Sequence, residues 1–198
     1  MVGMRGMVGV GISTRRRAGT VLTGVLVAAT LAVPVAAVPS DAVRLEMASD
    51  TGDYVGQGQT RVFTADDGTF TVTPVAIRQG VRVRFAGAVS WDLTFIAPDG
   101  EDLVPGPYGG ATRYPFQSPT GPGLSVSGEG RGCNTLIGRF DVLDIAFGPS
   151  GEVTRFAATF EQHCEGASPA LRGTMLYRTE APFDGPLDAD GDAVPDTV

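Results

Sequence analysis

The chain has 198 residues, and its 15 basic residues, all of them arginine, stand against 22 acidic residues for a formal net charge of −7. An acidic chain without an evident basic patch is a poor candidate for nucleic-acid binding, which depends on neutralising phosphates. Two cysteines exclude a cysteine-rich scaffold, 42% hydrophobic residues exclude intrinsic disorder, and the length suits one domain.

Residues 1–37 are organised as a secretory signal peptide. Arg15-Arg16-Arg17 precedes an apolar run from Val21 to Val38, and Val35-Ala36-Ala37 offers small residues for cleavage. A retained membrane anchor is the alternative, because the run approaches the length that spans a bilayer; Pro34 and the small residues favour cleavage. We therefore expect a secreted protein, extracellular or associated with the cell surface, with no membrane attachment after cleavage.

The segment 43–179 is predicted to be one all-β domain. Apolar and polar residues alternate with the two-residue period of half-buried strands, and no helical period exceeds one turn. Turn residues separate these runs, and Ala65-Asp66-Asp67-Gly68 predicts a hairpin. The predicted strands are Val43–Ser49, Thr60–Thr64, Thr69–Val75, Val81–Phe85, Trp91–Phe95, Gly123–Ser127, Leu136–Phe147, Arg155–Phe160 and Leu171–Arg178.

Short strands with glycine and proline turns predict an antiparallel, jelly-roll-like β-sandwich, with a small barrel as the alternative. The apolar phase shifts within Leu136–Phe147, which predicts a β-bulge near Val142. Val104–Gly123 is rich in proline and glycine and is predicted to be a long ordered loop. Residues 180–198 contain six acids, three prolines and no base, and are predicted to be an acidic tail or linker.

Cys133 and Cys164 are the two cysteines, 31 positions apart. Cysteines of a secreted protein meet an oxidising compartment, and this pair has no competing thiol. The sequence therefore predicts one disulfide, with two buried free thiols as the alternative.

Three stretches resemble an uncharacterised group of secreted bacterial β-sandwich domains. They are GDYVGQG at Gly52–Gly58, GRGCN at Gly130–Asn134 and FEQHCEG at Phe160–Gly166. The resemblance spans most of the mature body. It implies a secreted domain, often accompanied by other modules, with its two cysteines paired, and it implies no known catalytic residue.

The C-terminus resembles a calcium-binding repeat of the thrombospondin type 3 kind. Asp188, Asp190, Asp192 and Asp196 follow the spacing D-x-D-x-D-x-x-x-D. Alternate carboxylates in a tight loop can converge on Ca²⁺, which takes six to eight oxygen ligands. Ala193 departs from the pattern, since the sharp turn of the repeat needs glycine. The alternative is a solvated acidic tail, and Ca²⁺ is the one cofactor that the sequence suggests.

His163 is the sole histidine and shares strand parity with Glu161 and Glu165. These three side chains are a candidate metal group, but zinc usually recruits a second His or Cys. The favoured interpretation is that they orient one another around the disulfide. Asp50 and Asp53 lie in a glycine-rich loop, where a plain turn is favoured over a calcium site. No Gly-x-Ser-x-Gly motif supplies a nucleophile, so a non-enzymatic protein is predicted, with a small secreted hydrolase as an alternative.

Tyr108, Tyr114 and Phe116 are candidate ligand-binding residues of the predicted loop. Exposed aromatic residues of β-sandwiches commonly bind sugar rings, an analogy at the level of fold, and the alternative is that they pin the loop to the body. Trp91 is predicted to lie in the core, because Leu93 and Phe95 share its parity. We expect a secreted, non-catalytic interaction or accessory module that binds a cell-surface glycan or protein, with carbohydrate binding through this loop as the alternative.

Overall fold

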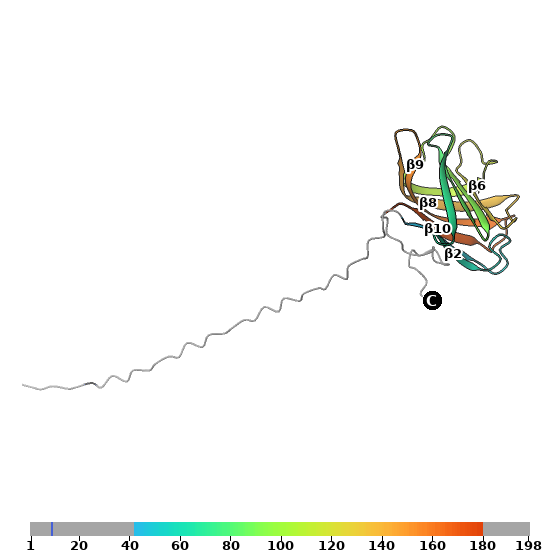
Figure 1. Ribbon diagram of the computed structural model, residues 1–198, viewed down its shortest axis with the longest axis horizontal. Coiled ribbons are helices and arrows are strands. Elements are labelled where there is room, and N and C mark those ends of the chain that lie inside the picture. Colours follow the sequence, from blue (N-terminus) through green and yellow to red (C-terminus); the bar gives the residue numbers. More distant parts are fainter. Residues whose placement is uncertain (1–8, 10–41, 180–198) are drawn as a thin grey trace, which may run out of the picture. The chain divides into compact units, whose positions relative to one another are not determined.

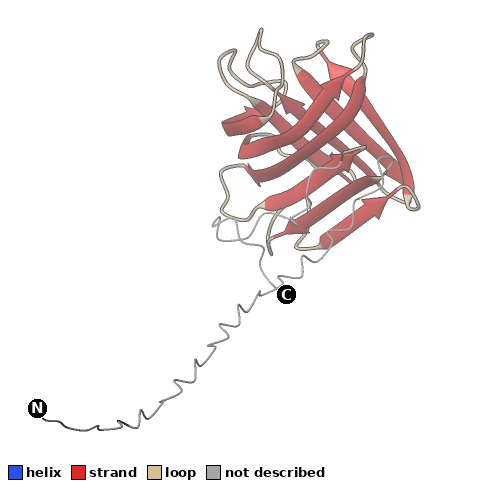
Figure 2. Ribbon diagram, turned by 90° about the vertical axis from the view of Figure 1, so that its left-hand side faces the viewer, coloured by secondary structure: helices blue, strands red, loops and turns tan. Residues whose placement is uncertain are grey.

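The computed structural model describes residues 42–179, together with Gly9. The predicted signal peptide and the predicted tail, including its four calcium-motif aspartates, therefore lie outside the described segment 42–179. That segment contains ten strands and no helix, as Figure 2 shows. No helix long and apolar enough to cross a bilayer occurs in the part of the chain that the structure describes. The strands are β1 (Val43–Ser49), β2 (Thr60–Thr64), β3 (Gly68–Val75), β4 (Gly80–Gly87), β5 (Ser90–Ile96), β6 (Gly106–Arg113), β7 (Gly123–Gly128), β8 (Leu136–Phe147), β9 (Val153–Cys164) and β10 (Leu171–Tyr177).

All ten strands belong to one sheet, in the order β2-β1-β10-β9-β8-β6-β7-β5-β4-β3. Neighbours are antiparallel except β6 and β7, which are parallel over two residue pairs. The sheet folds over so that the layer formed by β2, β1, β10, β9 and β8 faces the layer formed by β7, β5, β4 and β3. The domain is therefore nearly barrel-shaped (Figure 1). The predicted all-β, sandwich-like fold with one disulfide is thus confirmed.

The core lies between the two layers and is rich in aromatic side chains. Phe95 of β5 is fully buried, and its ring centre lies 5.4 Å from those of both Phe140 and Phe156. The ring of Phe160 is 6.2 Å away. Trp91 is also buried, as its strand parity predicted. Alternating side chains of each strand therefore interdigitate across the layers, the usual way in which two packed sheet faces stabilise each other.

The turn between β2 and β3 joins the two ends of the sheet. Asp67 accepts hydrogen bonds from the backbone N–H of Thr64 at 2.8 Å and from its hydroxyl at 2.9 Å. The turn is tight, as predicted, but the predicted hairpin is wrong, because the two strands lie at opposite edges of the sheet. Phe63 of β2 instead stacks on Phe85 of β4, with ring centres 4.5 Å apart. Packing between the two layers therefore takes the place of backbone pairing between β2 and β3. Because these two edge strands do not pair, the sheet does not close into a complete barrel.

Residues Gly106–Arg113 of the predicted loop Val104–Gly123 form strand β6, so the loop prediction is wrong for this part. This strand pairs with β8 through a register shift between Tyr108 and Ala111, and Gly110 within the shift has a φ of +68°. Only glycine adopts this conformation at no steric cost. The glycines that suggested a loop are therefore the residues that allow an irregular strand. A second register shift, between Val142 and Asp144, confirms the β-bulge predicted in β8.

The side chain of Gln162 in β9 connects the two layers where the sheet is weakest. Strands β6 and β7 pair only through Thr112–Gly123 and Arg113–Leu124. Beyond these pairs, the fully buried amide of Gln162 accepts a hydrogen bond from the N–H of Val126 at 3.0 Å and donates one to its carbonyl at 2.8 Å. The Gln162 amide thus bonds Val126 in the way that a peptide group of a neighbouring strand would.

We expect the substitution Gln162→Leu to lower the free energy of unfolding by about 2–6 kcal/mol, because it leaves two buried backbone groups of Val126 without partners at about 1–3 kcal/mol each. Urea unfolding of the two proteins measures this difference. The matched control is Gln59→Leu at an exposed position, which should change stability little. Equal stability of Gln162→Leu and the wild type would contradict the role assigned to the amide.

Candidate functional site

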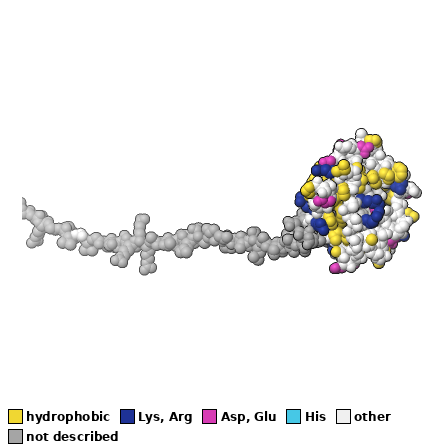
Figure 3. Space-filling view, turned by 45° about the horizontal axis from the view of Figure 1, so that its top comes forward, with side chains coloured by type: hydrophobic (Ala, Val, Ile, Leu, Met, Phe, Trp, Pro, Cys, Tyr) yellow, Lys and Arg dark blue, Asp and Glu magenta, His cyan; other side chains and the backbone are white. Residues whose placement is uncertain are grey.

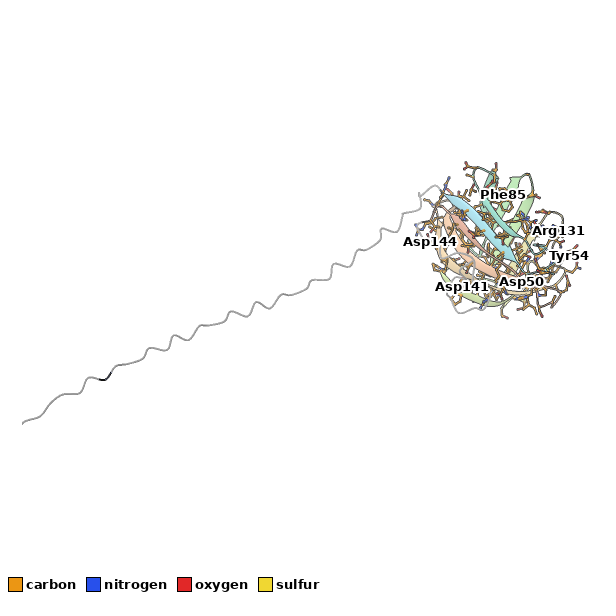
Figure 4. The ribbon with its side chains drawn as sticks, turned by 90° about the horizontal axis from the view of Figure 1, so that it is seen from below. Asp50, Tyr54, Phe85, Arg131, Asp141 and Asp144 are labelled. Atoms are coloured by element: carbon orange, nitrogen blue, oxygen red, sulfur yellow. A yellow bond between two sulfur atoms is a disulfide. The ribbon has the colours of Figure 1, made fainter. Side chains whose placement is uncertain are left out.

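The three sequence motifs at Gly52–Gly58, Gly130–Asn134 and Phe160–Gly166 meet at one end of the domain. Arg131 of the second motif donates a hydrogen bond to the carbonyl of Val55 in the first, at 3.4 Å. The second and third motifs are joined by the disulfide. Figure 4 shows Arg131 and Tyr54 at this end and Asp144 at the opposite end. Residues far apart in the chain therefore build one connected surface here.

The predicted disulfide between Cys133 and Cys164 is confirmed, with Cα atoms 5.0 Å apart. Both cysteines are buried. The bond ties the connection between β7 and β8 to the end of β9. It therefore holds the Gly130–Asn134 segment against the body of the sheet.

Glu165 strengthens the same connection from the turn that follows β9. Its carboxylate accepts hydrogen bonds from the backbone N–H of Asn134 and from the hydroxyl of Thr135, the latter at 2.9 Å. The bond from Asn134, aided by Thr135 and the charge of Arg113, holds the pKa of Glu165 below its usual range, although desolvation opposes the shift. Glu165 thus serves a structural role and does not complete the candidate metal group.

Glu161 and His163 belong to a different network on the outer face of β9. The Nε2 atom of His163 lies 3.2 Å from Glu161, and its Nδ1 lies 2.9 Å from the carbonyl of Ser168. Arg172 donates to Glu161 and to Asp50, at 2.9 Å in each case. Burial alone would raise the pKa of Glu161, but the hydrogen bond with His163 and the charges of two arginines outweigh it and lower that pKa. The favoured interpretation, mutual orientation, describes this arrangement.

The glycine-rich loop at Gly52–Gly58 is organised by Asp53. This buried carboxylate accepts hydrogen bonds from the hydroxyl of Ser49 at 2.9 Å and from the N–H of Gly56. Asp50 points elsewhere and accepts from the N–H of Ala170. The loop is a plain turn, and residues 42–179 hold no group of three or more His, Cys, Asp or Glu side chains with the arrangement of a metal site.

The three candidate aromatic residues differ sharply in exposure. Tyr108 stacks on Phe140 with ring centres 4.7 Å apart, and its hydroxyl bonds both backbone polar groups of Val104. Tyr108 therefore pins the chain, as the alternative interpretation held. Tyr114 is half-buried, whereas Phe116 is 71% exposed. Of the three, Phe116 presents its ring to solvent.

The guanidinium group of Arg113 lies 4.9 Å from the centre of the Phe116 ring. A cation over an aromatic face is attracted by the ring quadrupole, so Arg113 is held at Phe116 while the ring stays 71% exposed. Arg113 also donates to the carbonyl of Asn134 at 3.1 Å. Arg113 therefore connects the exposed ring to the segment that the disulfide holds.

Two grooves adjoin Arg113. The first, here called the Phe116 groove, has a volume of about 430 Å³ and is lined by both apolar and polar groups, with Leu136 among the apolar ones. Its lining includes Thr112, Arg113, Phe116, Ser118, Asn134 and Thr135. The second, here called the arginine groove, has a volume of about 540 Å³ and lies over β4, β5 and β7. Its lining includes Arg84, Ser90, Asp92, Arg113, Ser127 and Arg131.

The arginine groove was not predicted from the sequence. Alternation identified Arg82 and Arg84 only as the polar face of a strand. Their proximity to Arg113 depends on the parallel contact of β6 with β7, which no local pattern reveals. The available signal was that Arg84, Asp92 and Ser127 each lie on the outward face of a predicted strand. Only the strand order shows that these three strands are neighbours and that the residues lie side by side.

No protein-family model, curated protein or solved structure matches this chain. The functional assignment therefore depends on the geometry of these grooves.

We expect the variant Glu165→Gln to be less stable than the wild type at neutral pH and equally stable at low pH. A carboxyl whose pKa is lowered by folding stabilises the protein above its unfolded pKa, and this contribution is lost as the pH falls through the folded value. Glutamine imitates the protonated carboxyl, so the difference in melting temperature should shrink as the pH drops below about 4.5. Melting curves across pH measure it, with the exposed Glu101→Gln as control. A difference that persists at low pH would contradict this account.

Proposed function

We propose that the protein is a secreted, non-catalytic binding module and that its ligand is a saccharide bound at the Phe116 groove. One observation carries the proposal: Phe116 exposes its ring at the rim of a groove that hydroxyl and amide side chains also line. An aromatic face offers an apolar platform to a sugar ring, while hydroxyl and amide groups nearby bond its hydroxyls. The lining includes Thr112, Asn134 and Thr135, which have such groups.

Secretion is supported by the disulfide and by the signal-like residues 1–37. Disulfides persist in oxidising compartments and are rare in the cytosol. The Cys133–Cys164 bond closes the connection on which the groove stands, so the site itself benefits from an oxidising environment. Its resemblance to secreted bacterial β-sandwich domains agrees with this location and forms part of the same proposal.

A non-catalytic role is supported by the bonding of the groups that would perform hydrolysis. Both ring nitrogens of His163, the sole histidine, are engaged by Ser168 and Glu161. In the arginine groove, Asp92 is paired with Arg82 at 2.6 Å. The Asp92 carboxylate and the His163 ring are thus occupied by bonds within the protein, whereas a general acid or base must be within hydrogen-bond reach of a substrate proton.

The test is a glycan array followed by calorimetry of the full chain with the best saccharide. Phe116→Ala should weaken binding at least tenfold, since it removes the stacking platform. Tyr54→Ala is the matched control, because Tyr54 is an exposed aromatic residue outside both grooves. Binding that is unaffected by Phe116→Ala would reject this site, and the absence of any saccharide ligand would reject the function.

Calcium binding at Asp188, Asp190, Asp192 and Asp196 stays a separate prediction, because these residues lie outside the described part of the chain. We expect the full chain to bind Ca²⁺ weakly in a calorimetric titration, and the double substitution Asp188→Asn and Asp192→Asn to abolish the heat signal, because charged oxygen ligands dominate Ca²⁺ affinity. Glu152→Gln, within 42–179, is the control. Identical titrations for all proteins would identify the segment as a solvated tail.

A further inference from the structure

The arginine groove has more cations around it than carboxylates to neutralise them. Arg82 binds Asp92 with two nitrogens, at 2.9 Å and 2.6 Å. Arg84 reaches the same carboxylate only at 3.3 Å, and its side chain is 58% exposed. One aspartate thus serves two arginines, and the second retains unused N–H donors directed at solvent.

The opposite wall of the groove repeats this imbalance. Glu129 accepts from Arg61 at 2.8 Å and from Arg131 at 3.1 Å. Arg113 bonds the carbonyl of Asn134 and contacts an aromatic ring, neither of which is charged. The carboxylate of Glu165, whose charge Arg113 influences, is already bonded to backbone and hydroxyl donors. Five arginines in and around the groove therefore meet two paired carboxylates, Asp92 and Glu129.

This surplus is local. The described segment 42–179 contains 11 arginines and 15 acids, so it is acidic as a whole. Several acids lie instead on exposed turns, at 66, 67, 99, 101 and 102. Figure 3 shows a face on which arginine side chains gather near the middle, surrounded mainly by uncharged groups. A concave cationic site in an acidic protein attracts a small anionic group more than it attracts an extended polyanion.

The rest of the groove lining favours a saccharide. Ser90 and Ser127 provide hydroxyl groups, and the exposed Gly130 and Gly132 place main chain at the surface of the groove. A side chain at Gly128 would meet the ring of Trp91 at 2.3 Å, so this part of the groove is formed by main chain. Hydroxyl and peptide groups suit sugar hydroxyls; arginine clusters also recognise acidic peptide motifs, so the test below includes an acidic peptide.

We propose that the arginine groove binds the carboxylate groups of a short acidic saccharide, an oligomer of a few uronate units. Arg84 presents a planar guanidinium fork of the kind that matches a carboxylate in a bidentate geometry, and Arg113 and Arg131 add positive charge beside it. Arg113 lines both grooves, so a saccharide stacked on Phe116 continues over Arg113 into the arginine groove. This inference rests on the proposed saccharide-binding function and names the ligand class of the extended site.

Calorimetry of the full chain with hexagalacturonate tests the proposal, and the fully methyl-esterified hexamer serves as the ligand control because it has the same rings without charge. We expect the acid form to bind at least tenfold more tightly than the ester, with an affinity that falls as NaCl rises. Arg84→Gln should weaken binding of the acid form at least fivefold and leave binding of the ester unchanged. Arg78→Gln is the matched control, since Arg78 is 54% exposed, has one ion pair with Asp102 and lies outside the groove.

Melting temperatures of the two variants close to that of the wild type establish that any loss of binding is not a loss of fold. Equal binding of acid and ester, with Phe116→Ala still harmful, would overturn the acidic-ligand proposal and leave the proposed function standing. Binding of neither form, nor of any neutral saccharide, would overturn both. Tighter binding of a polyglutamate peptide than of hexagalacturonate would overturn the proposal in favour of an acidic peptide.

Discussion

The fold depends on the buried side-chain amide of Gln162, which joins the two layers of the sheet where strand pairing nearly fails. Strands β6 and β7 share two residue pairs, and beyond them the polar groups of Val126 bond the amide. In a buried region, leaving a peptide group unbonded costs about 1–3 kcal/mol, more than the roughly 0.5–1.5 kcal/mol that a hydrogen bond contributes on balance. The β6–β7 contact also positions Arg113, which lines both grooves, so the geometry of both grooves depends on this junction.

The neighbouring connection between β7 and β8 is restrained from a second direction. The Cys133–Cys164 bond closes a loop whose loss of unfolded-state entropy is worth about 3.5–4 kcal/mol. The carboxylate of Glu165 accepts hydrogen bonds from the backbone N–H groups of Asn134 and Thr135, which directly follow Cys133. A binding surface made of loops keeps a defined shape only when such supports hold it, and both supports converge beside Arg113.

Local chemistry predicted most of the strands and little of the site. Alternation located nine strands, and a phase shift located the bulge in β8. Strand β6 was not predicted, because its glycines and Pro107 are typical of loops. Its irregular pairing nevertheless needs a glycine with positive φ. The β2–β3 turn was recognised, but the pairing of these strands was not, because Phe63 stacks across the layers on Phe85. Among the candidate aromatics, only the packed structure distinguishes pinned Tyr108 from exposed Phe116.

Net charge is summed over the whole chain, so it does not reveal a local excess of positive charge such as that of the arginine groove. The acidity of this chain argues against tight binding of long polyanions, since exposed acids on the turns repel them over about a Debye length, roughly 8 Å at physiological ionic strength. Within the arginine groove, Asp92 and Glu129 each serve two arginines, so the local balance has the opposite sign. The same two carboxylates fix the orientation of the guanidinium groups, which reduces the entropy lost when a ligand binds. The ligand proposed for the arginine groove is therefore a short anionic saccharide, whose few charges fit a local excess of arginine within an acidic protein.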